Sequence, residues 1–148
     1  MTAVRLTILG CSGSVPGPGA PASGYLLEAD GFLLGVELGN GVLAELQARH
    51  DPFDLGALVF THLHPDHCAD FSALIVLRRY HPAPPRDVFA CRLPVHAPEY
   101  APRRLANAYA PDHAELADTD AVQRLIDLYT HQGNTTKADY WRQRLPRP

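Results

Sequence analysis

Long apolar runs, basic residues and cysteines are all scarce in this chain of 148 residues. No apolar run approaches the roughly 20 residues that a membrane-spanning helix needs. The first ten residues, MTAVRLTILG, begin a strand pattern at once and lack the apolar region and cleavage site of a signal peptide. We therefore expect no membrane partner for this protein.

The number of basic residues indicates whether the protein binds nucleic acid, and the cysteines indicate the compartment in which it is located. Lysine and arginine number 13, they are scattered along the chain, and the formal net charge is −3. A strong nucleic-acid-binding surface is therefore not expected, because such a surface gathers basic side chains. Cys11, Cys68 and Cys91 are odd in number and irregular in spacing, which argues against a disulfide framework and favours the reducing cytoplasm.

What is present is the composition of a globular protein, with 46% hydrophobic and 20% charged residues. Alternation, helical spacing and turn residues predict a layered α/β arrangement. The Gly- and Pro-rich segment 10–24 is expected to be a loop, and Asp30-Gly31 is a strong hairpin signal. The expected elements are a strand over 4–9, a hairpin over 25–39, a helix over 42–49, a buried strand over 57–62, a largely buried helix over 71–80, an extended segment over 87–98 and a helix over 99–110.

The composition changes near residue 115, where we place a domain boundary between 1–115 and 116–148. Helical spacing predicts a helix-turn-helix tail whose apolar residues are Val122, Leu125, Ile126, Tyr129, Ala138, Trp141 and Leu145. This helix pair is similar to a single tetratricopeptide repeat. A lone repeat cannot bury its own apolar face, so we expect the tail to pack on the α/β sheet.

The segment THLHPDH, residues 61–67, concentrates side chains that bind metals. His62 and His64 are two positions apart and would point the same way in an extended chain. Pro65 is expected to break regular structure, and Asp66 and His67 follow before a helix that begins near Asp70. Imidazole and carboxylate groups suit Zn²⁺, Mn²⁺ or Fe. Unpartnered loop histidines are the alternative, but chance clustering at this density is improbable.

Other chemistries have less support in the sequence. No serine occupies a G-x-S-x-G elbow, so a serine nucleophile with a histidine base is not indicated. The glycine-rich loop lacks both the G-K-[ST] of a phosphate-binding P-loop and the G-x-G-x-x-G spacing.

THLHPDH resembles the H-x-H-x-D-H signature of the metallo-β-lactamase superfamily. The preceding residues, with GCSGS and PASGYLLE, resemble the branch that contains RNase Z and atypical cyclic-nucleotide phosphodiesterases. The resemblance covers residues 3–110. It implies the first ββα half of an αββα sandwich, and a hydrolase that attacks a phosphodiester through a metal-activated hydroxide. The substrate would be a cyclic nucleotide or RNA-like molecule.

The resemblance also implies the site residues. His62 and His64 would bind one metal ion, Asp66 and His67 a second, and Asp66 would orient the attacking water. One or two Zn²⁺ ions are expected, with Mn²⁺ or Fe as alternatives. Under this assignment His64→Ala abolishes metal binding, whereas His96→Ala and His131→Ala leave it intact.

Two features depart from the family pattern. Glu37 stands where the family has an aspartate that supports the site from beneath, and its extra methylene would shift those hydrogen bonds. The ligands of the family's second half have no counterpart, because the remaining histidines (His50, His81, His96, His113 and His131) lack ligand spacing. A second copy or a partner chain could complete the site. The alternative function is a truncated, non-catalytic metal-binding or protein-interaction module.

Overall fold

The computed structural model describes residues 3–88, 90–109 and 135–142. The chain divides into two compact units, Met1–Ala101 and Pro102–Pro148, and each is described by itself. The predicted boundary near residue 115 lies outside the described residues.

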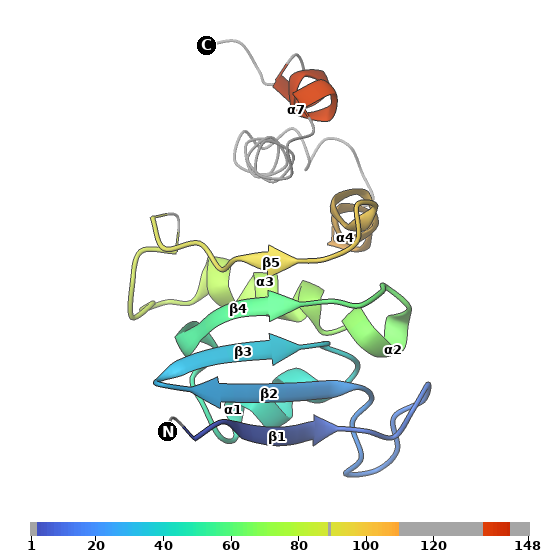
Figure 1. The fold of residues 1–148 in the computed structure, drawn as a ribbon, viewed down its shortest axis with the longest axis vertical. Coiled ribbons are helices and arrows are strands. Elements are labelled where there is room, and N and C mark those ends of the chain that lie inside the picture. Colours follow the sequence, from blue (N-terminus) through green and yellow to red (C-terminus); the bar gives the residue numbers. More distant parts are fainter. Residues whose placement is uncertain (1–2, 89, 110–134, 143–148) are drawn as a thin grey trace. The chain divides into compact units, whose positions relative to one another are not determined.

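A five-stranded sheet forms the first unit, with its strands side by side in chain order (Figure 1). The strands are β1 (Arg5–Gly10), β2 (Gly24–Ala29), β3 (Phe32–Val36), β4 (Leu55–Val59) and β5 (Val95–His96). The pairs β1–β2 and β2–β3 are antiparallel, whereas β3–β4 and β4–β5 are parallel. Together with the helices this confirms the predicted α/β class.

The predicted hairpin is formed by β2 and β3. Asp30 and Gly31 both adopt positive φ angles, 50° and 78°, as the two central residues of a type I′ turn require. This turn sets the register, in which Leu27 faces Leu34 and Ala29 faces Phe32. A local sequence signal was therefore sufficient to specify the pairing.

Helices α1 (Val42–Gln47) and α3 (Phe71–Tyr80) both lie on one side of the sheet, behind it in the view of Figure 1. The short helices η1 (Pro52–Asp54) and α2 (Pro65–Cys68) lie in the connections on either side of β4. The residues that are most completely buried in this unit include Leu26, Leu58 and Val42. The core of the unit therefore lies between the sheet and its helices.

The opposite face of the sheet is apolar and partly exposed. Leu6 and Ile8 of β1 are 59% and 57% exposed, and Phe32 of β3 is 51% exposed. The strand register places Leu6 beside Leu27 and Leu34, so these side chains share one face. In a fold of two sheets packed face to face, the second sheet would cover such an apolar face.

Several elements differ from their prediction. The strand predicted over 57–62 begins two residues earlier, as Leu55–Val59, and Phe60 is buried just beyond it. Of the extended segment predicted over 87–98, the described part contains only β5. The prediction that helix 71–80 is largely buried was wrong. Its bounds are as expected, but Leu74 alone is buried, because a helix on one face of a sheet leaves its outer side in water.

In the second unit the structure describes α4 (Ala101–Tyr109) and α7 (Thr135–Arg142). Helix α4 confirms the helix predicted over 99–110, and Pro102 lies in its first turn. Ala138 of α7 is fully buried. The helix predicted around Val122–Tyr129 lies outside the described residues, so the likeness to a tetratricopeptide repeat stays a prediction.

Two findings concern the length of the helices and the pairing of the cysteines. None of the helices in the described parts of the chain has both the length and the apolar character needed to cross a bilayer. The structure describes all three cysteines, and no disulfide joins them.

Candidate metal centre

Parallel pairing of β3 and β4 assembles the site. Val36 pairs with Val59, so the carboxyl ends of the two strands meet at the same edge of the sheet. Glu37 directly follows β3, and its backbone N–H donates to the carbonyl of Val59 over 2.9 Å. Segments that are more than 20 positions apart in the chain thus become neighbours at the start of THLHPDH.

A single helical turn brings the second half of the motif back toward the first. Pro65 is the first residue of α2, and His64 is its N-cap residue. The prediction that Pro65 breaks regular structure was wrong. Proline has no N–H to leave unbonded and a fixed φ, so it starts a helix readily. The N–H of His67 donates to the carbonyl of His64 over 3.0 Å.

The three histidines of the motif lie close together. The ring centroids of His62 and His64 are 4.8 Å apart, and those of His62 and His67 are 4.0 Å apart. The ring of His62 therefore lies close to both other rings, even though the three residues come from a loop and a helical turn.

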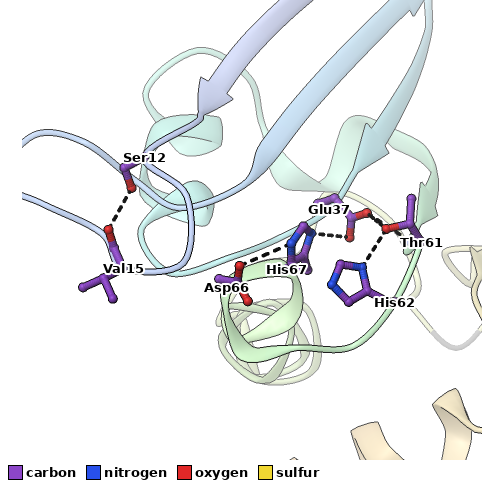
Figure 2. A network of polar contacts seen from close by, with 7 residues as sticks. All are labelled: Ser12, Val15, Glu37, Thr61, His62, Asp66 and His67. Atoms are coloured by element: carbon purple, nitrogen blue, oxygen red, sulfur yellow. Dashed lines mark hydrogen bonds and ion pairs between the residues drawn. The ribbon is translucent and has the colours of Figure 1, made fainter.

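His67 lies between two carboxylates (Figure 2). Its Nε2 is 3.3 Å from Oδ2 of Asp66, and its Nδ1 is 3.5 Å from Oε2 of Glu37. The imidazole is thus held on both sides by acidic groups.

Glu37 is the one buried charged or polar residue among the described parts of the chain, with 4% of its surface exposed. Its Oε1 accepts from the backbone N–H of Thr61 over 3.0 Å and from the Thr61 hydroxyl over 2.5 Å. The same hydroxyl oxygen is 2.9 Å from Nδ1 of His62 (Figure 2). Glu37 is therefore connected to two histidines of the motif, by different oxygens.

Two buried atoms at this point lack hydrogen bonds. Oε2 of Glu37 and Nδ1 of His67 are shielded from water and have no hydrogen-bond partner in the described structure. Buried polar atoms are normally satisfied, and a buried carboxylate normally has a cationic partner. A divalent metal ion would supply that partner. The donors of Glu37, His62 and His67 all lie within 4.8 Å of one another, and two imidazoles with one carboxylate are a zinc-binding set.

The other two predicted ligands lie beside this group. His64 is exposed and its ring touches that of His62, whereas Asp66 is half-buried and contacts His67. Neither belongs to the group whose donors lie within 4.8 Å.

The remaining histidines in the described residues lie elsewhere. Nε2 of His50 is 4.0 Å from Oε2 of Glu28, His81 packs on the ring of Phe53, and His96 is exposed on β5. His113 and His131 fall outside the described residues.

Thr61 had no predicted role, and Glu37 was predicted only to support the site from beneath. An acidic residue directly after the apolar run FLLGV, and two positions before a glycine, was the available signal in the sequence. That signal does not say which strand the segment joins, so the contact of Glu37 with His67 could not be predicted from it.

Backbone hydrogen bonds hold the motif in place. Ser23 N–H donates to the carbonyl of Asp66 over 3.1 Å, and Leu38 N–H donates to that of His67 over 2.7 Å. Gly39 packs against the carbonyl of Asp66 so closely that a Cβ there would overlap it. The orientation of Asp66 and His67 is therefore set by the segment that carries Glu37.

Asp70 connects the motif to a neighbouring helix. Its Oδ2 accepts from the N–H of Leu43, in the first turn of α1, over 2.9 Å. Burial raises the pKa of the Asp70 carboxyl above its ordinary value, and hydrogen bonds from the N–H groups of residues 41–43 oppose that rise. The helix predicted to begin near Asp70 is confirmed, since Asp70 is the N-cap residue of α3, but the Asp70 carboxylate accepts its hydrogen bond from α1.

Comparisons with known proteins agree with this geometry. An uncharacterized protein of Mycobacterium tuberculosis is 44% identical over 123 residues, which are 82% of this chain and 43% of that protein. Ribonuclease Z of Mycolicibacterium paratuberculosis is 33% identical over 76 residues, 51% of this chain and 27% of the enzyme. The chain thus spans less than half of the length of these relatives. No protein-family model matches it.

Bacillus subtilis YhfI is similar in both sequence and structure. The curated protein, named "Probable metallo-hydrolase YhfI", is 35% identical over 71 residues, 48% of this chain and 29% of that protein. The crystal structure of YhfI, described as a metallo-β-lactamase fold protein, superposes with a TM-score of 0.51 at 31% identity. It covers 52% of this chain and 31% of YhfI. The N-terminal half of this chain therefore has the metallo-β-lactamase fold and is related to YhfI and ribonuclease Z.

Proposed function

We propose that this chain is the metal-binding part of a metal-dependent hydrolase of the metallo-β-lactamase superfamily that cleaves a phosphodiester. The observation that carries the proposal is that the ring of His62 lies 4.8 Å from that of His64 and 4.0 Å from that of His67, beside a buried carboxylate oxygen of Glu37 that accepts no hydrogen bond. Loop histidines without a function would have no reason to be held together by two strands and a helical turn.

The ligands in this proposal are His62, His64, Asp66 and His67, which hold one or two divalent ions. Zn²⁺ fits the donor set, and Mn²⁺ or Fe are alternatives. Such an ion lowers the pKa of a water molecule and stabilises charge that develops on phosphoryl oxygens. The carboxylate of Asp66, which is half-buried beside His67, orients the attacking water and accepts its proton.

Our inference about the substrate class has two sources: the sequence resemblance to phosphodiesterase-like proteins, and the similarity to ribonuclease Z. Ribonuclease Z acts on RNA by its name, and the N-terminal strand, loop and hairpin resemble phosphodiesterase-like members of the superfamily. We infer a cyclic nucleotide or RNA-like phosphodiester as the substrate. The scarcity of basic residues favours a small molecule over a long nucleic acid. A cytoplasmic location stays a prediction from the cysteines.

A second candidate function is a non-catalytic metal-binding or protein-interaction module. The observation that favours it is that the matched region is 43% of the mycobacterial relative's length. If the further ligands of the family are needed for turnover, they have to come from outside these 148 residues.

Metal content and turnover test both candidates. Purified protein is stripped with a chelator, reloaded with Zn²⁺ or Mn²⁺, and assayed with bis(p-nitrophenyl) phosphate. We expect at least one ion per chain, metal-dependent hydrolysis, and loss of both in His67→Ala. His96→Ala, an exposed histidine outside the motif, is the matched control and should retain both. Bound metal without hydrolysis would favour the metal-binding module, and absence of metal would exclude both the hydrolase and the metal-binding module.

A further inference from the structure

We propose that β1 is an interaction surface for a second copy of this chain, and that the two β1 strands pair antiparallel about a two-fold axis at Leu6. The pairing joins two five-stranded sheets edge to edge into one continuous sheet. This inference goes beyond the proposed metal-dependent function and does not depend on it.

The first step concerns the open edge of the sheet. β1 is an outermost strand, with β2 on one side and no strand of the described residues on the other (Figure 1). Its backbone N–H and C=O groups that point away from β2 are therefore available to another strand. The sequence of β1, RLTILG, lacks the lysine and proline that commonly protect such an edge.

The second step concerns the side chains along this edge. Val4, Leu6 and Ile8 are 68%, 59% and 57% exposed, and they alternate along the strand. In the row that crosses the sheet at Leu6, Ala57 of β4 is buried, Leu27 of β2 is half-buried and Leu6 is exposed. A strand added beyond β1 would place cross-strand neighbours about 4.5–5.5 Å from Leu6 and Ile8, on the side that is now open.

The third step identifies the partner strand. Residues directly opposite each other lie on the same face of a sheet, so a matching strand has to be apolar at every second position. β1 itself has this pattern, which makes the edge self-complementary under a two-fold axis. With the axis at Leu6, the two Leu6 side chains lie opposite each other, and Val4 lies opposite Ile8 of the second copy.

The charge on β1 and its bulge favour this register over its neighbours. Arg5 then lies opposite Thr7, and the two Arg5 residues are four positions apart, about 13 Å along the strands. An axis at Arg5 would place the two arginines opposite each other, where like charges are destabilising. An axis at Thr7 would place Val4 opposite Gly10, beyond the point after Ile8 where the register of β1 shifts.

The pairing keeps the two metal centres apart. β1 runs in the same direction as β3, because both are antiparallel to β2, and the metal centre lies at the carboxyl end of β3. The two-fold axis reverses this direction in the second copy, so the two centres lie at opposite edges of the joined sheet and neither copy adds a ligand to the other. Five paired residues span about 17 Å, which corresponds to a small interface and therefore to a reversible dimer.

Sedimentation equilibrium of the full chain tests the association. Over roughly 1–100 µM, the range of a weak complex, we expect the wild type to change from monomer to dimer. Ile8→Lys should weaken the association by about tenfold or more, because the symmetry applies the substitution twice. Val15→Lys is the matched control, since Val15 is 75% exposed but lies in the loop after β1, and it should dimerise as the wild type does. A wild type that stays monomeric, or an Ile8→Lys variant that dimerises normally, would overturn the proposal.

Cysteine cross-linking tests the register. With the exposed Cys11 and Cys91 replaced by serine, Leu6→Cys should form a disulfide-linked dimer in oxidised glutathione. Directly opposite Cα atoms are about 4.5–5.5 Å apart, within the range that a disulfide spans. Val4→Cys should not cross-link with itself, but should cross-link when it is mixed with Ile8→Cys. A dimer that Leu6→Cys does not cross-link would show that the copies meet elsewhere, which refutes the pairing.

Zn²⁺ titration separates this inference from the proposed function. Ile8→Lys should bind Zn²⁺ with the affinity of the wild type, because each metal centre belongs to one copy. Loss of Zn²⁺ binding together with the dimer would contradict the arrangement. A wild type that dimerises and cross-links through Leu6→Cys without binding Zn²⁺ would refute the hydrolase and support the pairing of β1.

Discussion

At the scale of single residues, Gly39 determines how closely the strand segment and the metal-binding loop approach each other. A Cβ at Gly39 would overlap the carbonyl oxygen of Asp66 and lie 2.9 Å from Cβ of Ala22. Both neighbours are held by backbone hydrogen bonds, so neither can move at low cost.

Gly39→Ala should therefore destabilise the protein by about 1–3 kcal/mol, the usual cost of overpacking, and weaken Zn²⁺ binding as the loop is displaced. Urea unfolding and calorimetric titration measure the two effects. Gly17→Ala is the matched control, because a Cβ at Gly17 would meet only Cβ of Ala20, at 3.8 Å. Equal stability of the two variants would show that the loop adjusts freely.

At the scale of secondary-structure elements, Asp70 joins the loop that follows β4 to the first turn of α1. Its carboxylate caps α1 by accepting a hydrogen bond from the N–H of Leu43, which lies 27 positions earlier in the sequence. Loss of a cap typically costs about 0.5–2 kcal/mol. We expect Asp70→Ala to lower the free energy of unfolding by about that amount, and Asp70→Asn to lower it less, because the amide oxygen can still accept.

The pH dependence of the Asp70 variants has a definite sign. Burial raises the pKa of this carboxyl in the folded state, so the folded protein holds the proton more tightly than the unfolded chain does. The resulting stability is present below the pKa of the unfolded state and is lost as pH rises through the folded-state pKa. The free energy of unfolding of wild type minus that of Asp70→Asn should therefore fall as pH increases across the acidic range. A difference that increases with pH would show that the hydrogen bonds outweigh burial.

At the scale of the whole molecule, the tail is predicted from sequence to matter for folding. Val122, Leu125, Ile126, Tyr129, Trp141 and Leu145 are spaced for burial on helices. At about 1.5–3 kcal/mol for each large side chain, even partial burial is comparable to the 5–15 kcal/mol stability of a small domain. Truncation after residue 116 should give an aggregating product without a cooperative melt. A soluble truncation with a sharp thermal transition would indicate that the tail serves an external partner.

Much of the fold could be predicted because the signals are local. The turn at Asp30 and Gly31, the helix over 71–80 and the metal-binding motif each depend on neighbours within a few positions. Element ends were less predictable. Phe60 was expected inside a strand that runs to residue 62, but β4 ends at Val59, and the next residues already belong to the metal-binding loop.

By itself, the sequence determined that His62, His64 and His67 would be close, since a short loop and one helical turn cannot separate them far. Only the tertiary structure decided that Glu37 joins them. That contact depends on the parallel pairing of β3 with β4, in which Val36 pairs with Val59, 23 positions later in the chain, and no local pattern specifies this pairing. The burial that leaves Oε2 of Glu37 without a hydrogen bond has the same origin, because it comes from packing of segments that are remote in the chain.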